Sequence, residues 1–333
     1  MDETKLYSLV FAGEATTALV RAASPGPLIC VTRRTELVAV AATRGPAVAF
    51  VDLDLLPQLG GGMTDLFVVG IVDDTRGSAI RALVAYPWVT HLITTSMLSG
   101  PDARAHIEAL LERLESGPAN HVLGGPGLGR TALLGNSSRR EARFERMREF
   151  FAAQSISART ISAINDIAEE LVTNALYDAP LEAGYFKSAV LRTEEVELPP
   201  EHACEISYGI EHESVFVRVR DPFGALTRAR LLNVLNRCTA AGVSLDESRG
   251  GAGLGLWRIF STASTIAITV IPGALTDIHV RIEARKRRST GKQLLAVHLF
   301  FPEEHEAEGA HGRFAADHDH DLMDESFTAL CVA

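Results

Sequence analysis

Short apolar runs of strand length alternate with segments of helix length through residues 6–117. The runs are rich in β-branched and aromatic residues, and the last helical segment, residues 103–114, carries its leucines on one face. Strands that alternate with crossover helices favour a parallel sheet with helices on both sides, a doubly wound α/β fold. The five predicted strands are residues 6–12, 27–31, 48–53, 66–72 and 89–94.

This layout resembles the receiver domain of two-component response regulators. The resemblance implies an acidic cluster after the first strand, an aspartate after the third and a lysine after the fifth. Asp52 and Asp54 supply the third-strand carboxylate and are the candidate phosphoacceptors, but the first strand leads only to Glu14 and residues 94–96 read Thr-Thr-Ser. We therefore expect a degenerate receiver, a pseudo-receiver that works by docking. An α/β domain that merely shares the layout is the alternative.

Glycine, serine and proline dominate residues 118–138, which we interpret as a linker. Its residues 124–131 (Gly-Gly-Pro-Gly-Leu-Gly-Arg-Thr) nearly spell a P-loop, but they lack the flanking strand and helix and favour a hinge. The segment 302–333 is acidic and aperiodic, so we expect a disordered tail. The predicted domains are a receiver-like domain at 1–117, this linker, a second α/β domain at 139–301, and the tail.

The second domain opens with an arginine-rich amphipathic helix at residues 139–153, typical of a docking helix. Ser157 is a predicted N-cap for a helix over 158–179, which Pro180 should end. An irregular segment follows at 181–195. Further helices are predicted at 228–238 and 256–264, and strands at 203–210, 215–220, 266–271, 277–284 and 293–301.

Two polar motifs of this domain end regular elements. Glu170 and Asn174 lie four residues apart, on one face of the 158–179 helix. An amide oxygen such as that of Asn174, together with phosphates and waters, is a sufficient set of ligands for Mg²⁺. Asp221 follows the strand 215–220 and begins the turn Asp-Pro-Phe-Gly that closes at Gly224.

A third motif, Arg-Gly-Gly-Ala-Gly-Leu-Gly-Leu, spans residues 249–256. Glycines without a Cβ let backbone N–H groups converge on anionic oxygens, and the N-terminus of the following helix attracts the same charge. A dinucleotide site is disfavoured because a polar segment, and not a strand, precedes the glycines.

Together, these motifs resemble the histidine-kinase-like ATPase superfamily over roughly residues 140–301. The resemblance implies a two-layer α/β sandwich that binds ATP and Mg²⁺, with Glu170 as general base, Asn174 on the metal and Asp221 on adenine. Two departures are Tyr177-Asp178, where relatives often carry a basic residue or histidine, and the turn after Asp221. The nucleotide-binding residues expected from the resemblance are Asn174, Asp178, Asp221, Gly224, Arg249, Gly251, Gly253, Leu254, Gly255, Leu256 and Thr276.

Composition limits where the protein works. The formal net charge of −10 argues against non-specific binding to nucleic acid or to an anionic membrane surface. The chain shows no signal peptide and no apolar run long enough to span a bilayer. Its four cysteines are scattered without metal-binding spacing, which fits a reducing compartment. We expect a soluble cytoplasmic protein.

Two functions remain open at this stage. Residues 131–170 contain no histidine, so a histidine autokinase with its acceptor just before the ATP domain is excluded. The compact domain looks like that of anti-sigma-type serine/threonine kinases, which implies a sigma factor, an antagonist domain or another signalling protein as partner. The alternative is a non-catalytic regulatory or scaffold protein gated by nucleotide. Glu170 favours catalysis and the altered turn after Asp221 favours the alternative; a homodimer is left open.

Overall fold

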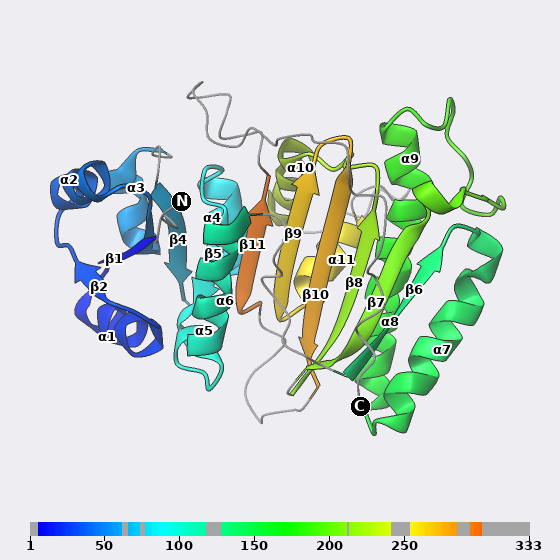
Figure 1. The fold of residues 1–333 in the computed structure, drawn as a ribbon, viewed down its shortest axis with the longest axis horizontal. Coiled ribbons are helices and arrows are strands. Elements are labelled where there is room, and N and C mark those ends of the chain that lie inside the picture. The colour runs from blue at the N-terminus through cyan, green and yellow to red at the C-terminus, as the bar shows by residue number, and fades with distance from the viewer. Residues whose placement is uncertain are drawn as a thin grey trace.

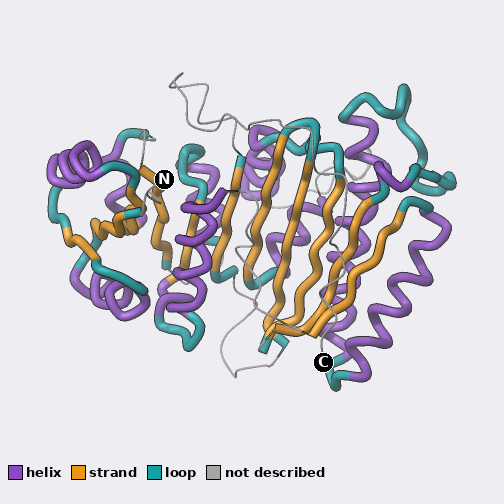
Figure 2. Tube along the Cα trace, viewed as in Figure 1, coloured by secondary structure: helices purple, strands orange, loops and turns teal. Residues whose placement is uncertain are grey.

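The computed structural model describes residues 6–61, 66–73, 77–117, 128–211, 213–240, 254–284 and 294–301. The strands of these residues form one mixed eleven-stranded sheet in the order β2-β1-β3-β4-β5-β11-β9-β10-β8-β7-β6 (Figures 1 and 2). Helices pack against the sheet, so the protein is of the α/β class. We call residues 6–117 the first half and residues 128–301 the second half.

Five parallel strands build the sheet of the first half, and they confirm the five predicted runs. One face packs on α1, α5 and α6 around Phe50, Ile93 and Leu110. The other packs on α2, α3 and α4, where Leu83 of α4 is fully buried. The elements are β1 (Tyr7–Phe11), α1 (Glu14–Ala23), β2 (Leu28–Cys30), α2 (Arg34–Arg44), β3 (Ala47–Asp52), α3 (Leu56–Leu59), β4 (Leu66–Val72), α4 (Ser78–Ala85), β5 (His91–Thr94), α5 (Thr95–Leu98) and α6 (Ala103–Ser116).

The second half continues the sheet with strands that are antiparallel to their neighbours, except that β9 and β11 run parallel. Its strands alternate: Val215, Val217 and Val219 of β8 are buried under helices, while Arg218 points to the other face and donates to Asp277 at 2.8 Å. The elements are β6 (Leu128–Leu134), α7 (Arg140–Ala153), α8 (Ala158–Thr173), α9 (Ala179–Glu182), β7 (Cys204–Glu211), β8 (Ser214–Asp221), α10 (Arg228–Ala240), α11 (Leu254–Thr262), β9 (Thr265–Ile271), β10 (Leu275–Glu283) and β11 (Ala296–Phe300).

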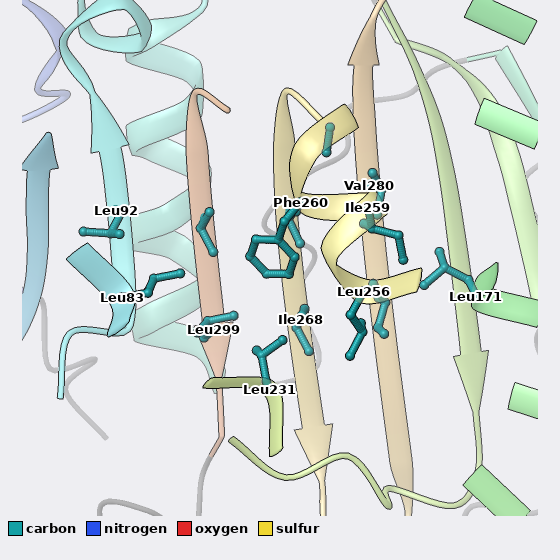
Figure 3. Packing of buried hydrophobic residues seen from close by; sticks show 14 of the residues in the cluster. Leu83, Leu92, Leu171, Leu231, Leu256, Ile259, Phe260, Ile268, Val280 and Leu299 are labelled. Carbon is teal, nitrogen blue, oxygen red and sulfur yellow. The ribbon is translucent and has the colours of Figure 1, made fainter. Parts of the chain in front are cut away.

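The two halves share one sheet and one core, which the sequence did not indicate. Strand β11 pairs antiparallel with β5, so the second sheet is an extension of the first. Behind the sheet, Leu83 and Leu231 belong to one buried cluster with side chains of α8 and α11 (Figure 3). The guanidinium of Arg228, at the start of α10, donates to the carbonyl oxygens of Pro87 and Val89. The halves therefore meet through strand pairing, apolar packing and a buried cation.

The prediction of a linker over residues 118–138 is wrong for its second part. Leu128–Leu134 forms strand β6, which pairs antiparallel with β7 at the outer edge of the sheet. A Cβ on Gly209 would lie 2.4 Å from the carbonyl oxygen of Leu128 and 2.7 Å from the Cα of Gly129. The glycines here serve close packing between strands, and not chain flexibility. Residues 118–127 and the predicted tail, 302–333, lie outside the described residues.

No helix within the described residues is long and apolar enough to cross a lipid bilayer.

Three buried histidines lie where the halves meet. His91 of β5 and His298 of β11 are partners in the strand register, and His106 of α6 lies against His298. The Nε2 atoms of His106 and His298 are 2.9 Å apart, so one ring donates and the other accepts. Burial, with a smaller contribution from Arg281, lowers the pKa of His106 to about 3; burial and its two histidine neighbours lower that of His298 as well.

Acid should therefore destabilise the protein well above the pH at which carboxylates titrate. Below about pH 6.5 the unfolded chain protonates these histidines while the folded state keeps them neutral, so stability falls with the pH. The His106 ring should cost about 2 kcal/mol of unfolding free energy between pH 7 and pH 5, and the His298 ring should add a loss of the same sign. Urea unfolding at both values checks this. His298→Asn should flatten the pH dependence, whatever its effect on absolute stability; an unchanged slope would contradict the assignment.

Candidate functional site

A cavity of about 780 Å³ lies between the helical layer and the strands β8 and β10. Its volume is in the range of small-molecule sites. One wall is the end of α8 with its continuation, a second is α10, and the floor is the sheet. Six residues that the sequence assigned to a nucleotide site line it together: Glu170, Asn174, Asp178, Asp221, Leu256 and Thr276.

The helix that carries Glu170 and Asn174 does not end at Pro180, so that prediction is wrong. The Ser157 hydroxyl caps its start by accepting from the N–H of Thr160 at 3.2 Å, as expected. At the other end, Asn174–Asp178 forms a π-helical turn that continues into α9. The wider turn accommodates a proline, which lacks an N–H and would clash in a regular α-helix. Asn174 and Asp178 consequently both face the cavity.

Glu170 is half-buried at the cavity wall beside the first turn of α11. A Cβ on Gly255 would lie 1.8 Å from the Cδ of Glu170, so a side chain at Gly255 would displace the carboxylate. Burial raises the pKa of Glu170; among the nearby charges, Arg192 lowers it and Asp178 raises it. The glycine motif and the Glu170 motif, which are far apart in the sequence, thus come into direct contact.

Asp221 and Thr276 form a second polar pair on adjacent strands, at paired positions of β8 and β10. Asp221 is 6% exposed and its Oδ1 accepts from the N–H of Phe223 at 3.0 Å. Burial raises its pKa from 3.8 to about 6, against the opposing effect of the N–H of Phe223 and the Thr276 hydroxyl nearby. The Thr276 hydroxyl itself is buried and makes no hydrogen bond of normal geometry within the described residues. Two buried groups thus present hydrogen-bonding capacity at this cavity.

Gly224 supports this pair without lining the cavity. Its φ of +58° is in the left-handed region, and a Cβ there would lie 2.1 Å from the carbonyl oxygen of Ile271. The turn after Asp221 therefore packs against the turn between β9 and β10, which requires a glycine at this position.

Other predicted site residues lie elsewhere. Arg249, Gly251 and Gly253 are outside the described residues, and Leu254 begins α11. Asp52 ends β3 and its Oδ2 accepts from the N–H of Gly13 at 2.7 Å; Asp54 lies in the short 3₁₀ turn that follows. Neither carboxylate lines the cavity.

Three arginines of the cavity were missed by the sequence reasoning: Arg192 from the irregular segment, and Arg230 and Arg237 from α10. Arg192 forms an ion pair with Asp178 at 3.2 Å, and Arg230 pairs with Glu182. The negative charge of Asp178, in a region where relatives often carry a basic residue, is therefore offset by cations from other elements. The spacing of Arg230 and Arg237 on one helical face could have been noticed; nothing in its local sequence marks Arg192.

No protein-family model matches this chain, and no curated protein matches it.

Asp221→Asn should stabilise the protein. The folded carboxyl group has a pKa of about 6 against 3.8 when unfolded, so above pH 6 folding must bury a charge. That burial costs about 3 kcal/mol, which an amide avoids. Urea unfolding should therefore show a gain in unfolding free energy that is larger at pH 8 than at pH 5.

The neighbouring carboxylate provides the control. Asp277→Asn removes the group that accepts two hydrogen bonds from Arg218, and it should lower stability. A loss for Asp221→Asn, or a gain that does not depend on pH, would show that the carboxylate is not strained by burial.

Proposed function

We propose that this protein is an ATP-binding signalling regulator similar to anti-sigma-type protein serine/threonine kinases, with Mg-ATP in the cavity of the second half. The second half would then be a histidine-kinase-like ATP-binding domain. The observation that carries the proposal is the convergence of Glu170, Asn174, Asp221, Thr276 and Leu256 on one cavity. These residues come from a helix, two strands and the start of another helix, and the sequence had assigned them to one nucleotide.

The polar pair of β8 and β10 fits the adenine end. An ionised Asp221 can accept a hydrogen bond from the exocyclic amino group of adenine, which guanine lacks at that position. The buried Thr276 hydroxyl has no other partner of normal geometry in the described part of the chain. An adenine ring would give both Asp221 and Thr276 a hydrogen-bond partner, and these hydrogen bonds would compensate for the burial of the carboxylate.

The other end of the cavity fits phosphates and a metal ion. Arg192, Arg230 and Arg237 line the cavity, and the N-terminus of α11 adds its dipole. Asn174 has the amide oxygen that Mg²⁺ accepts as a ligand beside phosphate oxygens. Bound Mg-ATP would supply a transferable phosphoryl group and a Mg²⁺ ion that offsets the negative charge of the phosphates.

Glu170 would act as the general base. Its carboxylate accepts the proton of an attacking serine or threonine hydroxyl, and the burial that raises its pKa makes it a better proton acceptor. Contact with Gly255 holds the carboxylate at the start of α11, beside the phosphate end of the cavity.

The first half, in this proposal, is a degenerate receiver domain that docks partners. Its parallel sheet has the order 2-1-3-4-5 that receivers share with flavodoxin-like folds. Thr95 and Ser96 follow β5 where a working receiver has a lysine. Asp52 and Asp54 remain candidate acceptors only for an external phosphodonor. The partner would be a sigma factor, an antagonist domain or another cytoplasmic signalling protein.

ATP titration by calorimetry, with and without Mg²⁺, tests the proposal, followed by γ-phosphate release in the same sample. Mg²⁺-dependent binding with turnover supports a kinase. Binding without turnover supports the alternative, a regulatory protein gated by nucleotide. The absence of binding would overturn both.

Substitutions in the site separate chemistry from binding. Glu170→Gln should lower phosphotransfer by about 100-fold or more because it removes the base, while ATP affinity changes little. Asn174→Ala should abolish the Mg²⁺ dependence of binding. Glu169→Gln is the matched control, since Glu169 is an exposed neighbour on the same helix and does not line the cavity. Full phosphotransfer in Glu170→Gln would show that the base is a different group.

A further inference from the structure

The irregular segment between α9 and β7 places one cation in the cavity, Arg192. Its Nη2 lies 3.2 Å from Oδ2 of Asp178, on the π-helical turn. The Arg192 side chain keeps 44% of its surface exposed and that of Asp178 keeps 29%. In the described part of the chain, the other donors of Arg192 form no hydrogen bond. The guanidinium is thus held from one side and open on the other.

Arg192 lies beside Asp178, which is on the same helical wall of the cavity as Glu170 and Asn174. Of the charges that act on the Glu170 carboxyl group, Arg192 has the largest influence, and Asp178 follows. Asp221 lies on strand β8, which belongs to the sheet floor of the cavity. Arg192 is thus paired with the helical wall that also carries Glu170, whereas Asp221 and Thr276 belong to the sheet.

The ion pair contributes little to folding. Pairs between groups this exposed are worth about 0–1 kcal/mol, because water screens them and the long side chain loses entropy. A guanidinium that is already oriented, with free donors in a fork, is well suited to a phosphate group, which it can bind through two parallel hydrogen bonds.

We propose that Arg192 is the residue that recognises the terminal phosphate of the bound nucleotide, and that Asp178 is its positioning residue. The inference rests on the proposed nucleotide binding. Asp178 holds the guanidinium at the cavity wall that also carries Glu170 and Asn174, before the ligand arrives. The site then distinguishes nucleoside triphosphates from diphosphates through a side chain of the irregular segment.

Calorimetric titrations of ATP, ADP and AMP with the full-length protein test this role. Arg192→Ala should weaken ATP binding by about 30-fold and ADP binding by about 3-fold or less, and leave AMP binding unchanged. Arg192→Lys should recover part of the ATP affinity because it keeps the charge but loses the fork. Lys187→Ala is the matched control, since Lys187 is an exposed cation of the same segment that does not line the cavity.

The role of Asp178 is tested by a double-mutant cycle. Asp178→Asn should weaken ATP binding in the parent protein and have no further effect in Arg192→Ala, because the carboxylate acts through the guanidinium. Additive losses would overturn the positioning role. Melting temperatures of all variants should stay within about 3 °C of the parent, given the small energy of the pair.

Inorganic tripolyphosphate, which has no base, separates this inference from the proposed function. Its binding should be lost in Arg192→Ala and retained in Asp221→Asn. If the parent protein binds tripolyphosphate in this way but not ATP, the nucleotide proposal fails and the phosphate site stands. If Arg192→Ala weakens ATP, ADP and AMP equally, or leaves ATP binding unchanged, Arg192 does not recognise the terminal phosphate.

Discussion

The antiparallel pairing of β11 with β5 is the interaction on which the rest of the architecture depends. It turns two sets of strands into one sheet, and it brings α4 and α10 together behind that sheet. Helix α10 then contributes side chains both to the core shared by the two halves and to the cavity. Leu231 and Leu235 are buried in the common core, while Arg230 and Arg237 line the cavity. The wall of the candidate site is therefore anchored on the first half, and the cavity cannot keep its shape independently of that pairing.

The junction between β5 and β11 and the candidate site both bury ionisable groups, with different consequences. At this junction, burial keeps the rings of His106 and His298 neutral, and a hydrogen bond joins their Nε2 atoms, while Nδ1 of His298 has no hydrogen-bond partner among the described residues. In the cavity, burial raises the pKa of Asp221 and leaves the Thr276 hydroxyl without a normal partner in the described residues. A binding site requires polar groups that lack hydrogen-bond partners in the folded protein, because a ligand can then form these hydrogen bonds.

Much of the secondary structure was predictable because the sequence carries local signals. The apolar runs of the first half, the cap at Ser157 and the alternation of β8 each reflect a periodicity or a turn preference of a few residues. The wrong predictions are those in which a contact between residues far apart in the chain overrides a local sequence preference. The glycines near Leu128 suggested a linker, yet they allow close approach between β6 and β7. Pro180 suggested a helix end, yet the chain passes through a π-helical turn before the proline and stays helical to Glu182.

The sequence by itself determined the α/β class, most of the elements and the pairing of motifs on single elements, such as Glu170 with Asn174 on one helical face. It did so because those relations depend on residues close together along the chain. Tertiary structure alone decided that both halves share one sheet, and that Arg192 reaches the cavity beside Asp178. An ion pair between an irregular segment and a helix has no periodic pattern in the sequence, because it depends on the tertiary path of the chain and not on neighbouring residues.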